Sequence, residues 1–241
     1  MIFDLDGTLV QTERLKGLSY ARAVAELRPE VPQADALAVF ARVVGRAREE
    51  VARALVAELD LDAAARRGAP ALGLRQPWQV VAALHARAYE AMLEDPGLVR
   101  RSVLAHNVAL VEHARRAGFP LALGSMSCRA HVDRVLGLLG LDGVFGVIAT
   151  RDDVVRGKPD PEIYLLLARE LGRTPHECLA IEDSAAGVTA ALTAGVACLA
   201  VPTSLTRPGL HAVARLDPRW LVEEPAAVAP AFDRLVATLS A

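Results

Sequence analysis

Residues 1–12 read MIFDLDGTLVQT and hold two acids, Asp4 and Asp6, two positions apart. The apolar residues around the first acid predict a short buried strand over Ile2–Leu5. Side chains at positions i and i+2 of a strand share a face, so both carboxylates are expected at the carboxyl end of this strand. Gly7 follows and permits a sharp turn, which lets the second acid leave the strand direction. Two carboxylates in this position need compensating partners from elsewhere in the chain.

The next part of the chain, from about residue 12 to residue 93, has apolar residues at helical spacing and no convincing strand pattern. Prolines and glycines interrupt it at 29–32, 68–70 and 73–77. This pattern predicts several helices that pack as a bundle.

Beyond Pro96 and Gly97 the pattern changes to strands that alternate with helices. Such alternation predicts a Rossmann-like parallel sheet covered by helices on both faces, an α/β fold. We therefore expect an α/β core domain at 1–11 and 96–241, and an all-helical cap domain at 12–95 inserted after the first strand. Further strands are predicted at 119–124, 144–149, 178–181 and 196–201, and helices at 107–117, 129–139, 160–172, 185–194 and 225–239.

Composition excludes several classes of protein. Hydrophobic residues make up 53% of the 241 residues and charged residues 23%, which predicts a packed core. A net charge of -2 and 4% aromatic residues give no basis for nucleic-acid or membrane partners. The three cysteines are scattered without a CxxC pair. Because the residues printed first already have a strand pattern, no signal peptide is expected. We expect a cytoplasmic protein that is a monomer or weak dimer.

Polar side chains follow four of the predicted strands, and the carboxyl ends of parallel strands meet at one edge of a sheet. Clustered carboxylates repel one another, and a hard divalent cation such as Mg²⁺ is the usual remedy. A hydroxyl and an ammonium beside them would hold the oxygens of a phosphate group. The residues in question are Asp4, Asp6, Ser125, Lys158, Glu182 and Asp183.

The spacing of Asp4 and Asp6 suits a division of labour in phosphoryl transfer. One carboxylate can attack phosphorus and form an aspartyl phosphate. The other can protonate the leaving oxygen and then take a proton from water. A metal ion and the ammonium of Lys158 would stabilise charge on the transferring phosphoryl group.

Four stretches resemble, in order, the four motifs of the haloacid dehalogenase superfamily: FDLDGTLVQTE, GSMS, GKPDPEIY and AIEDSAAGVTAALTAG. They are similar to the subgroup with a helical cap, which contains small-molecule phosphatases and β-phosphoglucomutases. The resemblance implies that Asp4 is the nucleophile and a Mg²⁺ ligand. It implies that Asp6 is the general acid/base and offers its backbone carbonyl to the metal. Ser125 resembles the phosphate-binding hydroxyl, and Lys158 the lysine of the third motif.

By the same resemblance, Asp183 is a third metal ligand, and Glu182 is its partner in the inner or outer shell. Two other classes of enzyme in the superfamily match this chain less well. The dehalogenases lack an acid at the position of Asp6. The phosphonate hydrolases carry a Schiff-base lysine in the cap, where this chain has only Lys16.

Residues 43–51, VVGRAREEV, resemble the substrate-specificity loop of the β-phosphoglucomutase-like members. Gly45 matches the glycine of that loop and Arg48 its phosphate-binding arginine, although a solvated helix face explains Arg48 equally well. Ser127 also has a counterpart in the mutase, but its position favours the N-cap of the helix that follows. The mutase has a histidine where this chain has Lys16, and its cap lysine aligns with His85 here.

We therefore expect Mg²⁺-dependent hydrolysis of a small phosphorylated metabolite, a sugar or polyol phosphate, through an aspartyl phosphate. The alternative within the family is β-phosphoglucomutase-like phosphoryl transfer on a hexose phosphate. The alternative from another class is a non-catalytic regulator that kept the fold. Lys16 is expected to reach the Asp6 region or the substrate phosphate, and all six histidines are expected to be surface or capping residues.

Overall fold

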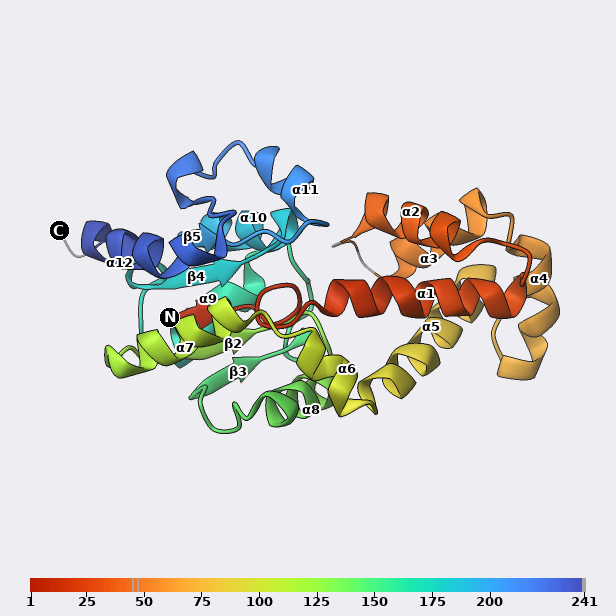
Figure 1. Cartoon of the computed structure of the whole chain (residues 1–241), viewed down its shortest axis with the longest axis horizontal. Coiled ribbons are helices and arrows are strands. Elements are labelled where there is room, and N and C mark those ends of the chain that lie inside the picture. The colour runs from red at the N-terminus through yellow and green to blue at the C-terminus, as the bar shows by residue number, and fades with distance from the viewer. Residues whose placement is uncertain (45, 47, 240–241) are drawn as a thin grey trace. The chain divides into compact units, whose positions relative to one another are not determined.

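The structure is a computed structural model that describes residues 1–44, 46 and 48–239 (Figure 1). The chain divides into two compact units, one made of Met1–Gln11 with Val99–Ala241 and the other of Thr12–Leu98. The sequence predicts that the helical domain ends at residue 95, whereas the helical unit of the structure ends at Leu98. Helix α6 (Pro96–Arg101) runs across this point. Its first turn is capped by the Asp95 carboxylate, which accepts from the Gly97 N–H at 2.8 Å.

The first unit contains a five-stranded sheet in the order β3-β2-β1-β4-β5. All four strand pairs are parallel, which confirms the predicted Rossmann-like sheet. The order reverses at β1, because β2 and β3 extend to one side of it and β4 and β5 to the other. Ligands in such sheets bind beyond the carboxyl ends of the strands at this reversal. The strands are β1 (Ile2–Phe3), β2 (Ala122–Gly124), β3 (Val147–Ala149), β4 (Leu179–Glu182) and β5 (Ala197–Ala200).

Helices cover both faces of this sheet, as predicted (Figure 1). Helices α9 and α10 pack against each other and bury apolar side chains against Ile2, Ala122 and Ala180, which point to one face. Helices α7 and α12 pack against each other, and α12 also contacts β5. The helices of this unit are α7 (Ala105–Arg116), α8 (Arg129–Leu139), α9 (Glu162–Glu170), α10 (Ala185–Ala194), α11 (Arg207–His211) and α12 (Val228–Leu239).

Most predicted elements of this unit are present, but the strands are shorter than the apolar runs. The run at 119–124 yields only three strand residues, since Pro120 has no N–H to donate to a neighbouring strand. Helices 129–139 and 185–194 begin and end where predicted, and both are followed by a glycine in the left-handed region, Gly140 and Gly195. Helix α11 was not predicted, because its five residues are too few for a periodic pattern.

Helices are the regular elements of the second unit, and its described residues form no strand, as its spacing predicts. Its apolar interior joins Tyr20, Phe40, Leu55 and Val81 from four different helices. The unit holds α1 (Thr12–Leu27), α2 (Gln33–Val43), α3 (Arg48–Glu58), α4 (Asp62–Gly68) and α5 (Pro77–Leu93).

The expectation that every histidine is a surface or capping residue is wrong for His85. Its ring is buried and stacks on Tyr20, with ring centroids 3.7 Å apart and planes 4° apart. Its Nδ1 lies 2.7 Å from the Ser19 hydroxyl, which itself donates to the Lys16 carbonyl. Because that hydroxyl has one proton to give, His85 Nδ1 must be the donor. A lone histidine on an apolar helix gave no sign of this stack in the sequence.

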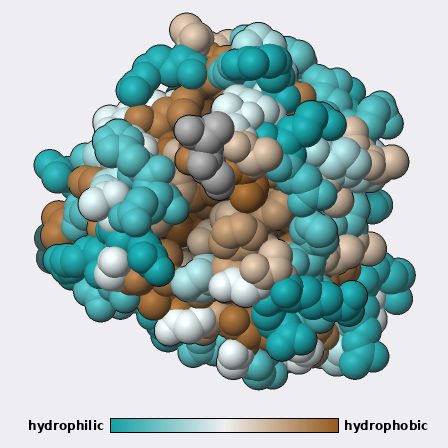
Figure 2. All heavy atoms as spheres, turned by 90° about the vertical axis from the view of Figure 1, so that its left-hand side faces the viewer, coloured by the Kyte–Doolittle hydropathy of each residue, from teal (hydrophilic) through white to brown (hydrophobic). Residues whose placement is uncertain are grey.

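The surface at the end of the first unit where the N-terminus lies carries apolar residues near its middle, with hydrophilic residues around them (Figure 2). Among the helices that the structure describes, none is both long enough and apolar enough to cross a bilayer. The strand ends with the predicted polar residues lie at the opposite edge of the sheet (Figure 1).

Candidate active site

Four strand ends bring polar side chains to one edge of the sheet. The hydrogen-bond ladder continues past β1 and β2, because Asp4 N donates to the Ile181 carbonyl and Ser125 N to the Ala149 carbonyl, each at 3.0 Å. Glu182 is the last residue of β4, and Lys158 lies on the loop after β3. The ladder therefore fixes the backbone of Asp4, Ser125 and Glu182 at neighbouring positions along the carboxyl edge of the sheet.

Lys158 lies at the centre of this cluster, and only 5% of its side chain is exposed. Its ammonium donates to Asp4 Oδ1 at 2.8 Å, to the Gly124 carbonyl at 2.9 Å and to Glu182 Oε1 at 2.5 Å. These three contacts use all three N–H groups. Burial alone would lower the pKa of Lys158, but the charges of Asp4 and Glu182 raise it above its ordinary value. Lys158 is therefore a fixed positive charge.

Glu182 is fully buried, and both of its carboxylate oxygens are committed to neighbours. Oε1 accepts from the Tyr164 hydroxyl at 2.7 Å as well as from Lys158. Oε2 accepts from the Ser184 hydroxyl at 3.2 Å. The carboxylate fits only because residue 187 is glycine, where an added Cβ would lie 2.0 Å from it. Ser184 also caps α10, since its hydroxyl accepts from the Gly187 N–H.

Tyr164 is a site residue that the sequence reasoning missed. Its ring is fully buried, and Lys158 Nζ lies 5.3 Å from the ring centroid. It therefore packs beneath the ammonium while its hydroxyl orients Glu182. The signal available in the sequence was its position within GKPDPEIY, six residues after Lys158.

The Asp4 carboxylate lies in an environment that would favour a bound cation. Burial raises its pKa to about 7, Lys158 opposes the rise, and the charges of Glu182 and Asp6 add to it. Its Oδ2 is buried and accepts no hydrogen bond from any described residue. An unsatisfied buried carboxylate oxygen is costly unless a ligand completes it.

Asp4, Glu182 and Asp183 each offer an oxygen, and these atoms lie within 4.8 Å of one another. All three side chains are buried. Hard divalent cations prefer such oxygen ligands, and the charge of a cation would lower the cost of gathering the three acids. The residues present therefore fit a divalent metal ion.

Gly7 shapes this cluster, because it has a φ of +91° and its N–H donates to the Val10 carbonyl at 2.7 Å. The predicted turn is thus present. A Cβ added at Gly7 would lie 2.1 Å from Oδ2 of Asp183, so the absence of a side chain is what admits that carboxylate.

Replacing Gly7 with Ala is expected to displace Asp183 and to reduce kcat/KM by roughly 100-fold, since a small misplacement at a reacting centre can cost that much. The strained backbone should also lower the free energy of unfolding by about 1–3 kcal/mol. Gly143→Ala is the matched control, because Gly143 has a φ of +70° and open space around it. Urea unfolding and steady-state kinetics separate the two effects. Wild-type activity in Gly7→Ala would contradict this account.

Ser125 and Ser127 both donate to Oδ2 of Asp6, at 2.9 Å and 2.7 Å. Ser127 also gives its backbone N–H to the Ser125 hydroxyl at 3.0 Å. The alternative that Ser127 caps helix α8 is wrong. Cys128 is the N-cap residue, and the Asp152 carboxylate accepts from the first helical N–H, that of Arg129. The Ser127 hydroxyl is turned toward the acids instead.

The residues predicted in the helical unit, Lys16, Gly45 and Arg48, belong to the second compact unit. Gly45 lies outside the described residues. Arg48 is exposed at the start of α3. Burial raises the pKa of the Tyr20 hydroxyl to about 12, and the positive charges of Arg48 and Lys16 oppose that rise, so both lie within electrostatic reach of it. Lys16 Nζ pairs with Glu13 at 3.0 Å.

The family pattern of haloacid dehalogenase-like hydrolases matches residues 1–195. The chain belongs to this family. The predicted resemblance is thereby confirmed, and the four strand ends described above all lie within the matched residues.

Similar proteins of this family include phosphatases. The chain is 38% identical over 109 residues to hexitol phosphatase A of Escherichia coli, a match covering 44% of this chain and 49% of that protein. It is 28% identical over 204 residues to the bifunctional riboflavin kinase/FMN phosphatase of Arabidopsis thaliana, which covers 84% of this chain and 48% of that protein. The matches thus span about half the length of these curated relatives.

Among solved structures, a hydrolase of the same family from Deinococcus radiodurans superposes with a TM-score of 0.71 at 26% identity. The match covers 99% of this chain and 95% of that one, which was solved with bound phosphate and sodium. The fold therefore agrees over nearly the whole chain, and the family pattern over residues 1–195.

Proposed function

We propose that this protein is a Mg²⁺-dependent phosphatase that hydrolyses a small phosphomonoester through an aspartyl phosphate on Asp4. The observation that carries the proposal is the contact of a buried, fully hydrogen-bonded Lys158 ammonium with Asp4. It places a positive charge beside a carboxylate whose other oxygen has no hydrogen-bond partner among the described residues. This pairing suits attack on a negatively charged phosphoryl group.

In the first step, Asp4 attacks phosphorus, the bond to the ester oxygen breaks, and Asp6 gives that oxygen its proton. In the second step, Asp6 takes a proton from water, and the water oxygen attacks the acyl phosphate. Inorganic phosphate leaves and the Asp4 carboxylate is restored. Lys158 donates to Oδ1 of Asp4 and so orients the carboxylate for this attack.

Ser125 and Ser127 have a second role in this proposal. Their hydroxyls converge on one oxygen of the Asp6 carboxylate in the structure. We propose that they donate to phosphate oxygens when a substrate is bound. Asp6 is then released from both serines and can face the leaving oxygen.

The carboxylates of Asp4 and Asp183 and the backbone carbonyl of Asp6 would hold the metal ion. Glu182 belongs to the outer shell, because its oxygens already accept from Lys158, Tyr164 and Ser184. When bound, Mg²⁺ neutralises charge on the phosphoryl group and on the clustered acids.

The substrate class is proposed to be sugar or polyol phosphates. One relative is named for hexitol phosphate hydrolysis and another for FMN, and both names describe phosphomonoesters of polyhydroxylated molecules. The helical unit is proposed to act as the cap that supplies specificity, with Arg48 and the loop at Gly45 as its phosphate-recognition residues. No nucleic acid or membrane partner is proposed, and the oligomeric state remains predicted as a monomer or weak dimer.

A panel of phosphorylated metabolites, assayed with Mg²⁺ for release of inorganic phosphate, tests the proposal. We expect turnover of hexitol and hexose phosphates above that of a generic aryl phosphate. β-Glucose 1-phosphate is the informative substrate, since formation of glucose 6-phosphate faster than free phosphate would favour the mutase. Absence of turnover on every substrate, the aryl phosphate included, would favour a non-catalytic regulator.

A further inference from the structure

The loop that carries Lys158 is exposed on both sides of that residue. Val155, three residues earlier, is 83% exposed, while the Lys158 side chain is 5% exposed. Val154 holds the start of this loop in the apolar core, and beyond Val154 the loop is held in one conformation mainly by its hydrogen bonds. The groups that accept those bonds therefore decide where the Lys158 ammonium lies.

Glu162 provides the main anchor on the outer side of the loop. One of its carboxylate oxygens accepts the N–H of Val155 and the other accepts the N–H of Arg156, each at 2.9 Å. Hydrogen bonds from backbone N–H groups to a carboxylate are among the stronger ones in proteins. The same two bonds, the larger one from Val155, hold the pKa of Glu162 below its ordinary value. The carboxylate thus stays charged and fixed near neutral pH.

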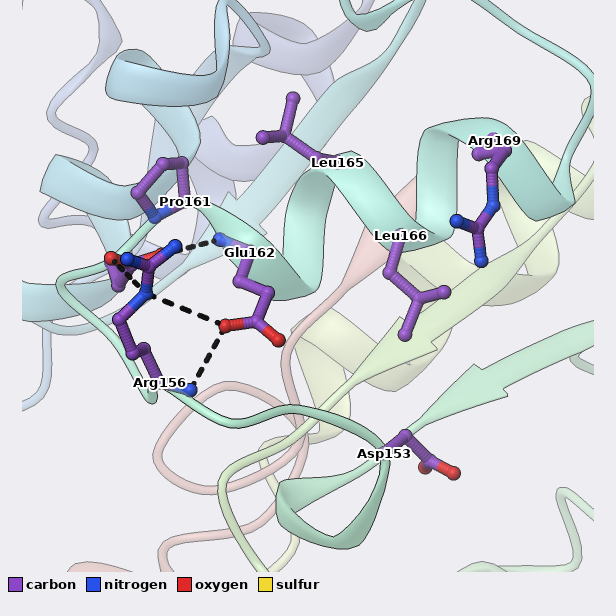
Figure 3. Close-up of a pocket in the computed structure, with 8 residues that line it drawn as sticks. Asp153, Arg156, Pro161, Glu162, Leu165, Leu166 and Arg169 are labelled. Atoms are coloured by element: carbon purple, nitrogen blue, oxygen red, sulfur yellow. Dashed lines mark hydrogen bonds and ion pairs between the residues drawn. The ribbon is translucent and has the colours of Figure 1, made fainter.

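The side chains of Arg156 and Glu162 point toward each other on the outer side of the loop (Figure 3). The Arg156 guanidinium lies 3.0 Å from Asp160 and 3.6 Å from Glu162. Asp160 in turn accepts the Glu162 N–H at 3.0 Å. These residues line part of a groove of about 490 Å³ on the surface, so Glu162 can be changed without opening the apolar core.

Helix α9, which Glu162 begins, is a rigid base for this anchor. Ile163, Tyr164 and Leu167 are fully buried beneath the sheet. The same helix therefore fixes the Lys158 loop from outside through Glu162 and orients Glu182 from inside through Tyr164. Lys158 lies between the two.

We propose that Glu162 is a positioning residue that places the Lys158 ammonium against Asp4 and the substrate phosphate. The proposal rests on the proposed function, because it assigns Glu162 an effect only through the role of Lys158 in phosphoryl transfer. It differs from a purely structural role, which would change stability without changing the reaction.

Glu162→Gln keeps the shape but replaces one acceptor oxygen with an amide NH₂, which faces a backbone N–H. We expect kcat on an aryl phosphate with Mg²⁺ to fall by roughly 10- to 100-fold, with a smaller change in KM. Glu177→Gln is the matched control. The Glu177 carboxylate accepts the N–H and hydroxyl of Thr174, each at 2.8 Å, at a turn away from the Lys158 loop. Both bonds reach one oxygen of Glu177, which the glutamine carbonyl can replace as acceptor, so this control should keep thermal stability and kcat near those of the wild type.

A double-mutant cycle with Lys158→Ala tests whether Glu162 acts through Lys158. The readout is the affinity for inorganic phosphate by calorimetry, which does not require turnover. We expect Glu162→Gln and Lys158→Ala each to weaken phosphate binding, and the double variant to bind no more weakly than Lys158→Ala alone.

Additive losses in the double variant would overturn the inference, as would a Glu162→Gln variant that loses stability but keeps kcat and phosphate affinity. In both cases the proposed function would stand if Lys158→Ala alone is impaired. If Lys158→Ala binds phosphate and turns over like the wild type, the proposed role of Lys158 fails, and the inference fails with it.

Discussion

Asp4→Asn is expected to reduce kcat by a factor on the order of 10⁴ or more, a loss comparable to removal of a catalytic nucleophile in other enzymes. The amide cannot form an acyl phosphate, although its oxygen can still accept from Lys158 as Oδ1 does in the structure. The fold should persist, because the replacement has the same shape and Lys158 keeps its contacts with Gly124 and Glu182.

Asp6→Asn is the matched comparison. It lies in the same turn but leaves the proposed nucleophile intact, so the phosphoenzyme should form slowly and persist. Intact-protein mass spectrometry after a short exposure to substrate should detect one added phosphoryl group in Asp6→Asn and none in Asp4→Asn. Turnover by Asp4→Asn at the wild-type rate, with unfolding unchanged, would rule out the proposed intermediate.

The core of the site could be predicted because it depends on strand ends, which the sequence marks well. An apolar run followed by Asp4, Ser125 or Asp183 indicates both the strand and the edge where it stops. Parallel topology then brings these residues together without any detail of side-chain packing. The glycine at position 7 was predictable for the same reason, since the turn that it permits is local.

The rest of the site depends on packing, which the sequence does not mark. Tyr164 looks like an ordinary apolar position of an amphipathic helix, and only the structure shows its hydroxyl on Glu182. Glu162 looks like a solvated acid in the first turn of that helix, where acids are common. His85 was misplaced because its burial depends on Tyr20, which lies on another helix. Such contacts join residues that lie on different elements of the chain, so no local sequence pattern predicts them.

Packing also distinguishes the two acids at the end of β4, Glu182 and Asp183. The Glu182 carboxylate already accepts hydrogen bonds from Lys158 and Tyr164. An acid bonded in this way orients its neighbours. Asp183 lies against Gly7, in space that a side chain at position 7 would fill. Replacing Asp183 with Asn should therefore weaken metal affinity directly. Glu182→Gln should change kcat through Lys158 and Tyr164 and leave metal affinity closer to that of the wild type.

Removal of divalent metal is expected to reduce activity by a factor on the order of 10³ or more, since a metal ion at a phosphoryl group supplies several kcal/mol of charge stabilisation. The structural reason is the gathering of Asp4, Glu182 and Asp183 within 4.8 Å, balanced among the described residues mainly by Lys158. Protein dialysed against chelator should regain activity with Mg²⁺. Ca²⁺ should restore it poorly, because Ca²⁺ takes more ligands in a looser geometry.

Metal binding can also be measured without turnover, by the rise in thermal stability as Mg²⁺ is titrated into chelator-treated protein. We expect the wild type and Glu182→Gln to be stabilised at similar Mg²⁺ concentrations, and Asp183→Asn only at much higher ones. Wild-type activity after exhaustive chelation would show that Lys158 alone balances the acids. The orphaned oxygen of Asp4 would then need a different ligand, and the substrate phosphate would be the remaining candidate.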